Sequence, residues 1–216
     1  MRTAAILPVK SFGSAKQRLG ELIEQDARSR LMRAMLADVL EALAAVPELE
    51  RVLVVTANPL AAELDGDPRV KVLHDDREDG QSVAALIGIA HARAAGFDRV
   101  LLVPGDAPLL DSSELSALLA RPEPLVIVPD RHGTGTNGLL LCPVDAFAPS
   151  FGPGSLARHE AAAAETGLPW TVDPLPCLVL DVDTPDDLEA TAAALEARSG
   201  GASATRAALR RLSLPA

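Results

Sequence analysis

The stretch RVLLVPGD, residues 99–106, decides the fold class. Its apolar run has the length of a strand and leads without a break into Gly105-Asp106. Similar runs recur as AAILPV (4–9), RVLVVT (51–56), VKVLH (70–74), LVIVPD (125–130), GLLLCP (138–143) and CLVLDVD (177–183). Segments with helical spacing lie between most of them, including residues 25–46, 82–95 and 185–198. Near-continuous apolar strands that alternate with helices predict an α/β fold with helices on both faces of a mostly parallel sheet.

Length and composition indicate one domain. The 216 residues suffice for one well-buried core and are few for two. Hydrophobic residues make up 48% of the chain, which excludes a disordered protein. Because aromatic residues are only 2%, the core must consist mainly of Leu, Val, Ile and Ala. We expect a single domain over residues 1–198, followed after a Gly/Ser-rich break by a tail over 199–216 with room for a short helix.

The charge balance limits the partners. A formal net charge of −10 argues against a nucleic-acid partner, because binding a phosphate backbone requires a broad basic face. No apolar run approaches the roughly 18 residues of a membrane span, and the first residues lack the apolar region of a signal peptide. We therefore expect a soluble cytoplasmic protein without a membrane partner. Cys142 and Cys177 lie in apolar surroundings and are interpreted as small buried side chains.

A basic loop follows the first apolar run. The stretch VKSFGSAKQRL (9–19) contains Lys10, Lys16 and Arg18, and no acidic residue precedes Glu21. The chain has only three lysines, so two in one loop suggest a place for a compact, mobile ammonium group. Ligands of such sheets bind at the carboxyl ends of the strands. The loop is thus a candidate site for a small anion.

Carboxylates follow two other runs. The run at 101–104 leads into Gly105 and then Asp106, and the glycine allows close approach. Asp181 and Asp183 end the last run, and the helix cap predicted at Thr184 does not need them. A divalent cation such as Mg²⁺ prefers ligands of this kind. The alternative for Asp106 is an ordinary turn residue.

Two glycine-containing loops are candidate anion sites. GTGTN (133–137) offers hydroxyls and backbone N–H groups, and FGPGS (151–155) precedes a helix for which Ser155 is a plausible N-cap, with Arg158 one turn inside. Structural glycine turns are the alternative. GTGTNG also matches the dinucleotide motif GxGxxG, but it opens a strand-like run rather than a helix, and no P-loop is present. These facts argue against a dehydrogenase.

A third candidate site lies at the start of the helix expected at 82–95. Thr56 ends the second run, and Asp75 begins an acidic loop that leads to Gly80-Gln81-Ser82. Backbone amides and an amide side chain at a helix start suit a nucleobase or a phosphate. A solvated acidic loop is the alternative.

Five motifs together resemble one enzyme family. They are PVKxxxxAKxRL, GDAPLL, DRHGTGTNGLLL, FGPGS and LDVDTPDDL, in this order over about residues 3–198. They resemble the phosphoenolpyruvate or 2-phospholactate guanylyltransferases of coenzyme F420 biosynthesis, which are related to the nucleotidyltransferases of molybdenum-cofactor assembly. The resemblance implies a three-layer, Rossmann-like GT-A core. One departure concerns base recognition, because relatives often have Gly-Leu-Asn where this chain has Gly80-Gln81-Ser82.

The resemblance also implies a reaction, in which the phosphate of a three-carbon acid attacks the α-phosphorus of GTP and pyrophosphate leaves. Catalysis of this kind is mostly positioning and charge neutralisation. Asp106, with Asp183 or Asp181, would hold Mg²⁺, for which Mn²⁺ could substitute. The triphosphate would contact Lys10, Lys16 and Arg18. The nucleotide would further contact Thr56, Asp75, Gly80, Gln81 and Ser82. The acceptor would contact Thr136, Asn137, Gly152, Ser155 and Arg158.

The sequence leaves alternatives for the acceptor and for the function. An Ala- and Arg-rich composition is typical of GC-rich bacteria, where the phosphoenolpyruvate branch of the family is expected. The product would be handed to the next enzyme of the pathway. Rivals are a nucleotidyltransferase for molybdopterin or a sugar phosphate, which usually carries an LAGGxSxRMG-type loop, and a catalytically silent nucleotide-binding module.

Overall fold

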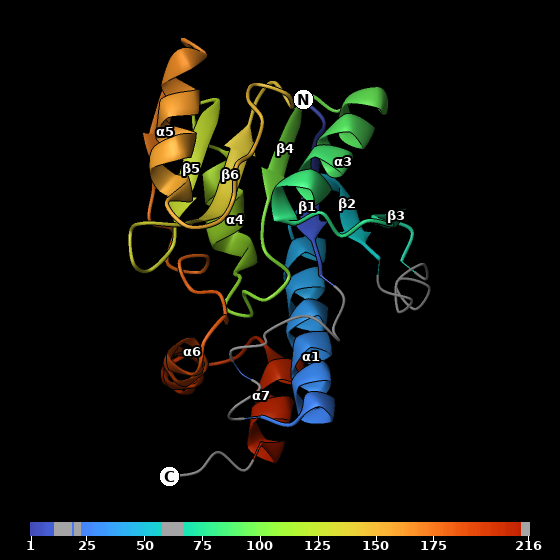
Figure 1. Ribbon diagram of the computed structural model, residues 1–216, viewed down its shortest axis with the longest axis vertical. Coiled ribbons are helices and arrows are strands. Elements are labelled where there is room, and N and C mark those ends of the chain that lie inside the picture. Colours follow the sequence, from blue (N-terminus) through green and yellow to red (C-terminus); the bar gives the residue numbers. More distant parts are fainter. Residues whose placement is uncertain (11–18, 20–22, 58–66, 213–216) are drawn as a thin grey trace.

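A computed structural model describes residues 1–10, 19, 23–57 and 67–212 (Figure 1). Helices and strands alternate along most of these ranges, as the sequence predicts, but β6 follows β5 directly and α7 follows α6. The strands are β1 (Thr3–Pro8), β2 (Leu49–Thr56), β3 (Val70–His74), β4 (Arg99–Leu102), β5 (Leu125–Pro129), β6 (Thr136–Leu141) and β7 (Trp170–Val172). The helices are α1 (Gln25–Ala44), α3 (Gln81–Ala94), α4 (Ser112–Leu119), α5 (Ser155–Glu165), α6 (Pro185–Ala197) and α7 (Ser203–Arg211).

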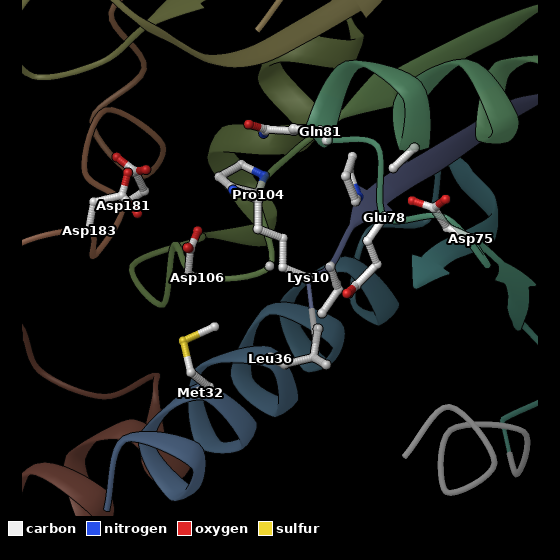
Figure 2. Close-up of a pocket in the computed structure, with 15 residues that line it drawn as sticks. Lys10, Met32, Leu36, Asp75, Glu78, Gln81, Pro104, Asp106, Asp181 and Asp183 are labelled. Carbon is white, nitrogen blue, oxygen red and sulfur yellow. The ribbon is translucent and has the colours of Figure 1, made fainter. Parts of the chain in front are cut away.

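Within the described ranges, the strands form one seven-stranded sheet in the order β3-β2-β1-β4-β6-β5-β7. Strand β6 runs antiparallel to β4 and β5, and the other pairs are parallel, so the prediction of a mostly parallel sheet is confirmed. The central strands β1 and β4 pair with Ile6 opposite Leu102. Their carboxyl ends therefore meet at one edge of the sheet, which brings Lys10 near Asp106 (Figure 2).

The sheet is covered on both faces. Along β1, Ala5 and Leu7 belong to the apolar cluster that includes the inner face of α1, whereas Ala4 and Ile6 belong to the cluster that includes α3. Period-two alternation in which both sets are buried is the mark of a strand covered on its two faces. The predicted three-layer arrangement is confirmed.

The run CLVLDVD is not a strand, and the sequence prediction was wrong there. Residues 173–183 have no regular secondary structure, and the seventh strand is β7. Pro174 and Pro176 have no N–H to give to a sheet, and the N–H groups of Leu178 and Val179 both donate to Leu175 O, at 2.9 and 3.1 Å. The segment buries its apolar side chains under the sheet without joining its ladder.

Two helices begin at side-chain caps, and the cap at Thr184 is the one that the sequence predicts. The Asp111 carboxylate accepts hydrogen bonds from the backbone N–H groups of Ser113 (2.9 Å) and Glu114 (3.2 Å) at the start of α4. At α6, Thr184 is the N-cap and forms a capping box with Asp187. The capping box thus fixes the residue at which α6 begins.

The segment expected as a tail contains α7, which packs against α1 (Figure 1). The buried carboxylate of Asp38 on α1 accepts hydrogen bonds from the backbone N–H groups of Ala204 (3.1 Å) and Thr205 (2.7 Å). This contact places a negative charge at the positive end of α7.

No described helix is both long and apolar enough to cross a lipid bilayer. Burial raises the pKa of the Cys177 thiol to about 12, so this cysteine is an inert core residue.

Candidate active site

Three carboxylates from distant segments meet at the carboxyl edge of the sheet. Asp106 follows β4, whereas Asp181 and Asp183 precede α6 (Figure 2). One carboxylate oxygen from each lies within 4.8 Å of the others. The backbone N–H of Val182 donates to Asp106 O over 3.2 Å, which joins the two segments. The expectation that these carboxylates share one place is therefore met.

Gly105 is required by close packing at this point. A Cβ on Gly105 would lie 3.0 Å from Val9 Cγ2 and 3.5 Å from Leu36 Cδ1. The first distance is tighter than most real Cβ contacts allow. Glycine thus lets the chain that carries Asp106 pass against β1 and α1.

Polar contacts hold the Asp181 carboxylate and the backbone of Asp183 in place. The amide nitrogen of Asn137, on β6, donates to Asp181 Oδ1 (3.1 Å) and to Leu178 O (3.0 Å). Because both partners can only accept, the orientation of the Asn137 amide is determined. Asp187 Oδ2 accepts from the backbone N–H groups of Asp183 (3.1 Å) and Thr184 (2.8 Å). These contacts pre-organise the cluster before any ligand binds.

The cluster has the chemistry of a divalent-cation site. Three carboxylates so close together repel one another unless a cation lies between them. Hard oxygen ligands from two loops, one of them oriented by the Asn137 amide, suit Mg²⁺ or Mn²⁺. The residues present therefore fit the predicted metal.

A first cavity, of ≈ 160 Å³, lies between β1, α1 and the start of α3. Met32 and Leu36 provide an apolar wall, and the carboxylate cluster closes one end (Figure 2). Four of the predicted nucleotide contacts line it, namely Lys10, Asp75, Gly80 and Gln81. An apolar wall with a few polar groups is the usual form of a site for a flat organic ligand.

Two other predicted nucleotide contacts do not line this cavity. Thr56 is buried at the end of β2, where its carbonyl accepts the Asp75 N–H at 3.2 Å. Ser82 Oγ accepts the Phe151 N–H at 2.9 Å and so ties α3 to the loop before α5. Lys16 and Arg18 lie outside the described residues.

A second, larger cavity of ≈ 610 Å³ lies between the β5–β6 connection and the loop before α5. It shares Lys10, Gln81, Asp181 and Asp183 with the first cavity. Four of the predicted acceptor contacts line it: Thr136, Asn137, Gly152 and Ser155. The two cavities are thus neighbours that meet at an exposed lysine and at two of the three clustered carboxylates, Asp181 and Asp183.

Arg158 does not line the second cavity. Its guanidinium donates to Ser150 O (2.9 Å) and Pro153 O (2.7 Å), which holds the loop before α5 in shape. The predicted N-cap at Ser155 is also wrong, because Gly154 occupies that position with a φ of 71° and Ser155 is the first helical residue. A left-handed conformation favours glycine there.

The backbone N–H groups expected to be free in these loops are mostly used within the chain. Asp130 accepts from His132, Gly133 and Thr134, through its carboxylate or its carbonyl. The Ser155 and Leu156 N–H groups donate to Gly152 O (3.0 Å) and Thr134 O (3.1 Å). Side-chain hydroxyls, rather than these N–H groups, are left to contact a ligand.

Sequence reasoning missed several residues of the second cavity. Asp130 and Asp187 both line it. Arg131 links two sides of this cavity through an ion pair with Asp187 at 2.8 Å. Asp130 ends an apolar run, which was a usable signal. Asp187 was attributed to the helix cap alone, and no local pattern predicts that it also receives Arg131.

His159, on the inner face of α5, is fully buried behind the second cavity. Its Nδ1 lies 2.9 Å from Thr136 Oγ1, and its Nε2 accepts the Ser150 N–H at 2.8 Å. Burial, and to a smaller extent the charge of Arg158, lowers the pKa of His159 to about 4. The imidazole is therefore neutral at physiological pH.

Comparison with known proteins finds relatives that are similar over most of the chain. The phosphoenolpyruvate guanylyltransferase of Conexibacter woesei is 49% identical over 216 residues, which cover 98% of this chain and 97% of that protein. The 2-phospho-L-lactate guanylyltransferase of Methanothermobacter thermautotrophicus is 38% identical over 190 residues, which cover 87% and 83%.

Solved structures share the fold at lower identity. A Desulfovibrio desulfuricans G20 protein assigned as a nucleotide-diphospho-sugar transferase has a TM-score of 0.78 at 20% identity, with 97% of this chain and 95% of that one covered. A nucleotidyl transferase from Methanothermobacter has a TM-score of 0.62 at 19% identity, covering 91% and 99%. The profile of the guanylyl transferase CofC-like family matches residues 3–212. The chain therefore belongs to the guanylyl transferase CofC-like family, whose members are nucleotidyltransferases.

Proposed function

We propose that this protein transfers GMP from GTP to the phosphate of phosphoenolpyruvate, with release of pyrophosphate, in coenzyme F420 biosynthesis. The observation that carries the proposal is the meeting of two cavities at Lys10, Asp181 and Asp183, with Asp106 beside them in the first cavity. A transferase of this type must hold a nucleotide and an acceptor on either side of one reacting phosphorus. The family and the name of the Conexibacter relative supply the identities of the two substrates.

In the proposed reaction, an oxygen of the acceptor phosphate forms a bond to the α-phosphorus of GTP. The bond from the α-phosphorus to the oxygen that bridges to the β-phosphate breaks, and the electron pair leaves with pyrophosphate. The attacking oxygen is already ionised at neutral pH, so the reaction requires no general base. Catalysis then rests on alignment and on neutralising the charge of two anions.

Lys10 is suited to the second task because it lines both cavities. Two unit charges about 4 Å apart interact by roughly 4 kcal/mol at an effective dielectric constant near 20. Without nearby positive charge, the acceptor and the triphosphate would repel each other strongly. We propose that Lys10 lies near the transferred phosphate, and that Lys16 and Arg18 hold the departing pyrophosphate.

The carboxylates Asp106, Asp181 and Asp183 would hold Mg²⁺, with Mn²⁺ as a substitute. A bound divalent cation would reduce the charge on the α-phosphate and orient it. Asn137 would keep the carboxylate of Asp181 directed into the cluster. Asp187 would hold the backbone of Asp183 in place. These contacts support the proposed metal because one orients the Asp181 carboxylate and the other fixes the backbone that carries Asp183.

For the acceptor, phosphoenolpyruvate is favoured because the relative at 49% identity carries that name. The relative at 38% identity is named for 2-phospho-L-lactate, which is the second candidate. Both acids have a phosphate and a carboxylate on a three-carbon frame, so one cavity can accept either. The proposal places the reaction in the cytoplasm, with hand-over of the product to the next enzyme.

The test is pyrophosphate release with GTP, Mg²⁺ and each acceptor in turn. We expect release with phosphoenolpyruvate and little with ATP or CTP in place of GTP. Release with 2-phospho-L-lactate alone would change the acceptor, and absence of release with both acids would contradict the proposed function. A reaction without acceptor measures background hydrolysis of GTP.

A further inference from the structure

The buried histidine of α5 connects two walls of the second cavity. His159 contacts Thr136 on β6 through Nδ1 and Ser150, in the loop before α5, through Nε2. Its ring also packs against Phe151, with ring centroids 5.2 Å apart in an edge-on arrangement. The side chain is 0% exposed, so it cannot touch a ligand itself. Any role in the reaction must pass through its two hydrogen-bond partners.

The hydrogen bonds of the ring determine its tautomer. A backbone N–H can only donate, so the 2.8 Å contact from Ser150 requires a lone pair on Nε2 of His159. The lowered pKa keeps the ring neutral, and a neutral ring without a proton on Nε2 carries it on Nδ1. The Nδ1–H group therefore donates to Thr136 Oγ1 over 2.9 Å.

This direction determines what the Thr136 hydroxyl can do. Its oxygen accepts from His159, which leaves the hydroxyl proton for another partner. Thr136 lines the second cavity, and its hydroxyl has no second protein partner within the described part of the chain. The proton is thus available to an anion in the cavity.

We propose that His159 is a positioning residue that makes the Thr136 hydroxyl a hydrogen-bond donor to the anionic acceptor. The inference rests on the proposed function for the identity of that acceptor. It assigns to His159 a role in acceptor affinity in addition to holding Ser150. The competing explanation is that His159 only keeps the loop before α5 in shape.

Two substitutions separate these roles. In His159→Asn, the amide nitrogen lies the same number of bonds from Cα as Nδ1, so it can donate to Thr136 but not reach Ser150. In His159→Gln, the amide oxygen lies the same number of bonds from Cα as Nε2, so it can accept from Ser150 but loses the donor to Thr136. The two variants have similar polarity, and each retains one of the two hydrogen bonds.

The measurement is the KM for phosphoenolpyruvate and for GTP, with circular dichroism to verify folding. We expect His159→Gln to raise the phosphoenolpyruvate KM about tenfold, the usual effect of losing one hydrogen bond to an anion. His159→Asn should stay within about threefold of the wild type, because one donor is kept. The GTP KM should not change in either variant. His91→Gln, a histidine of α3 that lines neither cavity, is the control.

A Thr136 variant checks the route of the effect. Thr136→Val removes the hydroxyl at nearly constant shape, and adding His159→Gln to it should then raise the KM no further. Additive effects would show that His159 does not act through Thr136. The reverse order, with Asn impaired and Gln normal, would overturn the inference and favour the loop role, as would equal effects on both substrates.

The tautomer provides a readout that does not depend on turnover. Nitrogen-15 NMR of the histidine-labelled protein should show a protonated Nδ1 and an unprotonated Nε2 for His159, assigned with His159→Asn, and the opposite tautomer would overturn the inference. If the wild type releases no pyrophosphate with either acid, the proposed function fails. The inference is then decided by this spectrum and by the affinity for inorganic phosphate, which His159→Gln should weaken and His159→Asn should not.

Discussion

The backbone N–H of Val182 donates to the carbonyl oxygen of Asp106 across 3.2 Å. This bond connects an irregular segment to the end of β4, although 76 residues separate the two positions in the sequence. It places Asp181 and Asp183, on either side of Val182, next to the carboxylate of Asp106. The proposed metal site thus includes a backbone contact between two segments that the sequence keeps far apart.

Replacing Asp106 by Asn should abolish most turnover. The amide has no charge to offer a cation, so we expect the rate of pyrophosphate release to fall at least a hundredfold, about the loss seen when an electrostatic catalytic group is removed. The melting temperature should change little. Asp186→Asn, on the exposed side of α6, is the matched control. A wild-type rate at saturating Mg²⁺ would remove Asp106 from the metal site.

Replacing Asn137 by Ala should weaken metal binding. Asp181 would lose the hydrogen bond from the amide nitrogen that directs its carboxylate into the cluster. We expect the Mg²⁺ concentration for half-maximal rate to rise about ten- to a hundredfold, as for other residues that orient metal ligands. The measurement is a Mg²⁺ titration at saturating substrates. An unchanged midpoint would show that Asp181 is oriented by other contacts.

Replacing the three basic residues of the first loop singly by Ala should separate their roles. We expect Lys10→Ala mainly to lower kcat, because this side chain lines both cavities. Lys16→Ala and Arg18→Ala should mainly raise the KM for GTP. Steady-state kinetics with varied GTP at saturating phosphoenolpyruvate provides both constants. An effect of Lys10→Ala on the KM for GTP alone would argue against its place near the transferred phosphate.

Replacing Ser155 by Ala should affect the acceptor more than the nucleotide. Ser155 is 1% exposed, and it lines the second cavity but not the first. Its hydroxyl can therefore reach only a ligand in the second cavity. We expect the KM for phosphoenolpyruvate to rise by about five- to tenfold, the effect of one lost hydrogen bond. Ser203→Ala, at the exposed start of α7, controls for loss of a serine. If the acceptor KM does not change, the acceptor lies elsewhere.

The pH dependence of stability should report the buried His159. Its pKa is lowered to about 4 in the folded protein, whereas an unfolded histidine titrates near 6.5. Between these values only the unfolded state binds the proton, so the free energy of unfolding falls as the pH falls from about 6.5 to 4.

The full effect of that shift is up to about 3 kcal/mol. The check is chemical denaturation of the wild type and His159→Asn at several pH values. As the pH falls, the wild type should lose stability relative to the variant, because Asn does not titrate. A difference that is constant with pH would show that His159 has an ordinary pKa.

Local sequence patterns were sufficient for the fold class and for part of the site. Apolar runs and helical spacing report which residues are buried, and this placed most strands and helices correctly. The cap at Thr184 could be predicted because a helix start depends on hydrogen bonds within one turn. Asp106 could be selected because it directly follows a buried run.

The tertiary structure decided what depends on contacts between distant segments. An apolar run shows that a segment is buried but not whether it joins a sheet, so residues 177–183 read like a strand although they are irregular. The antiparallel position of β6 depends on its pairing with β4 and β5, which no local period encodes. The contact of His159 with Thr136 likewise arises only when α5 packs against the sheet. The local sequence pattern indicates which residues are buried, whereas the packing of the whole fold determines which residues contact one another.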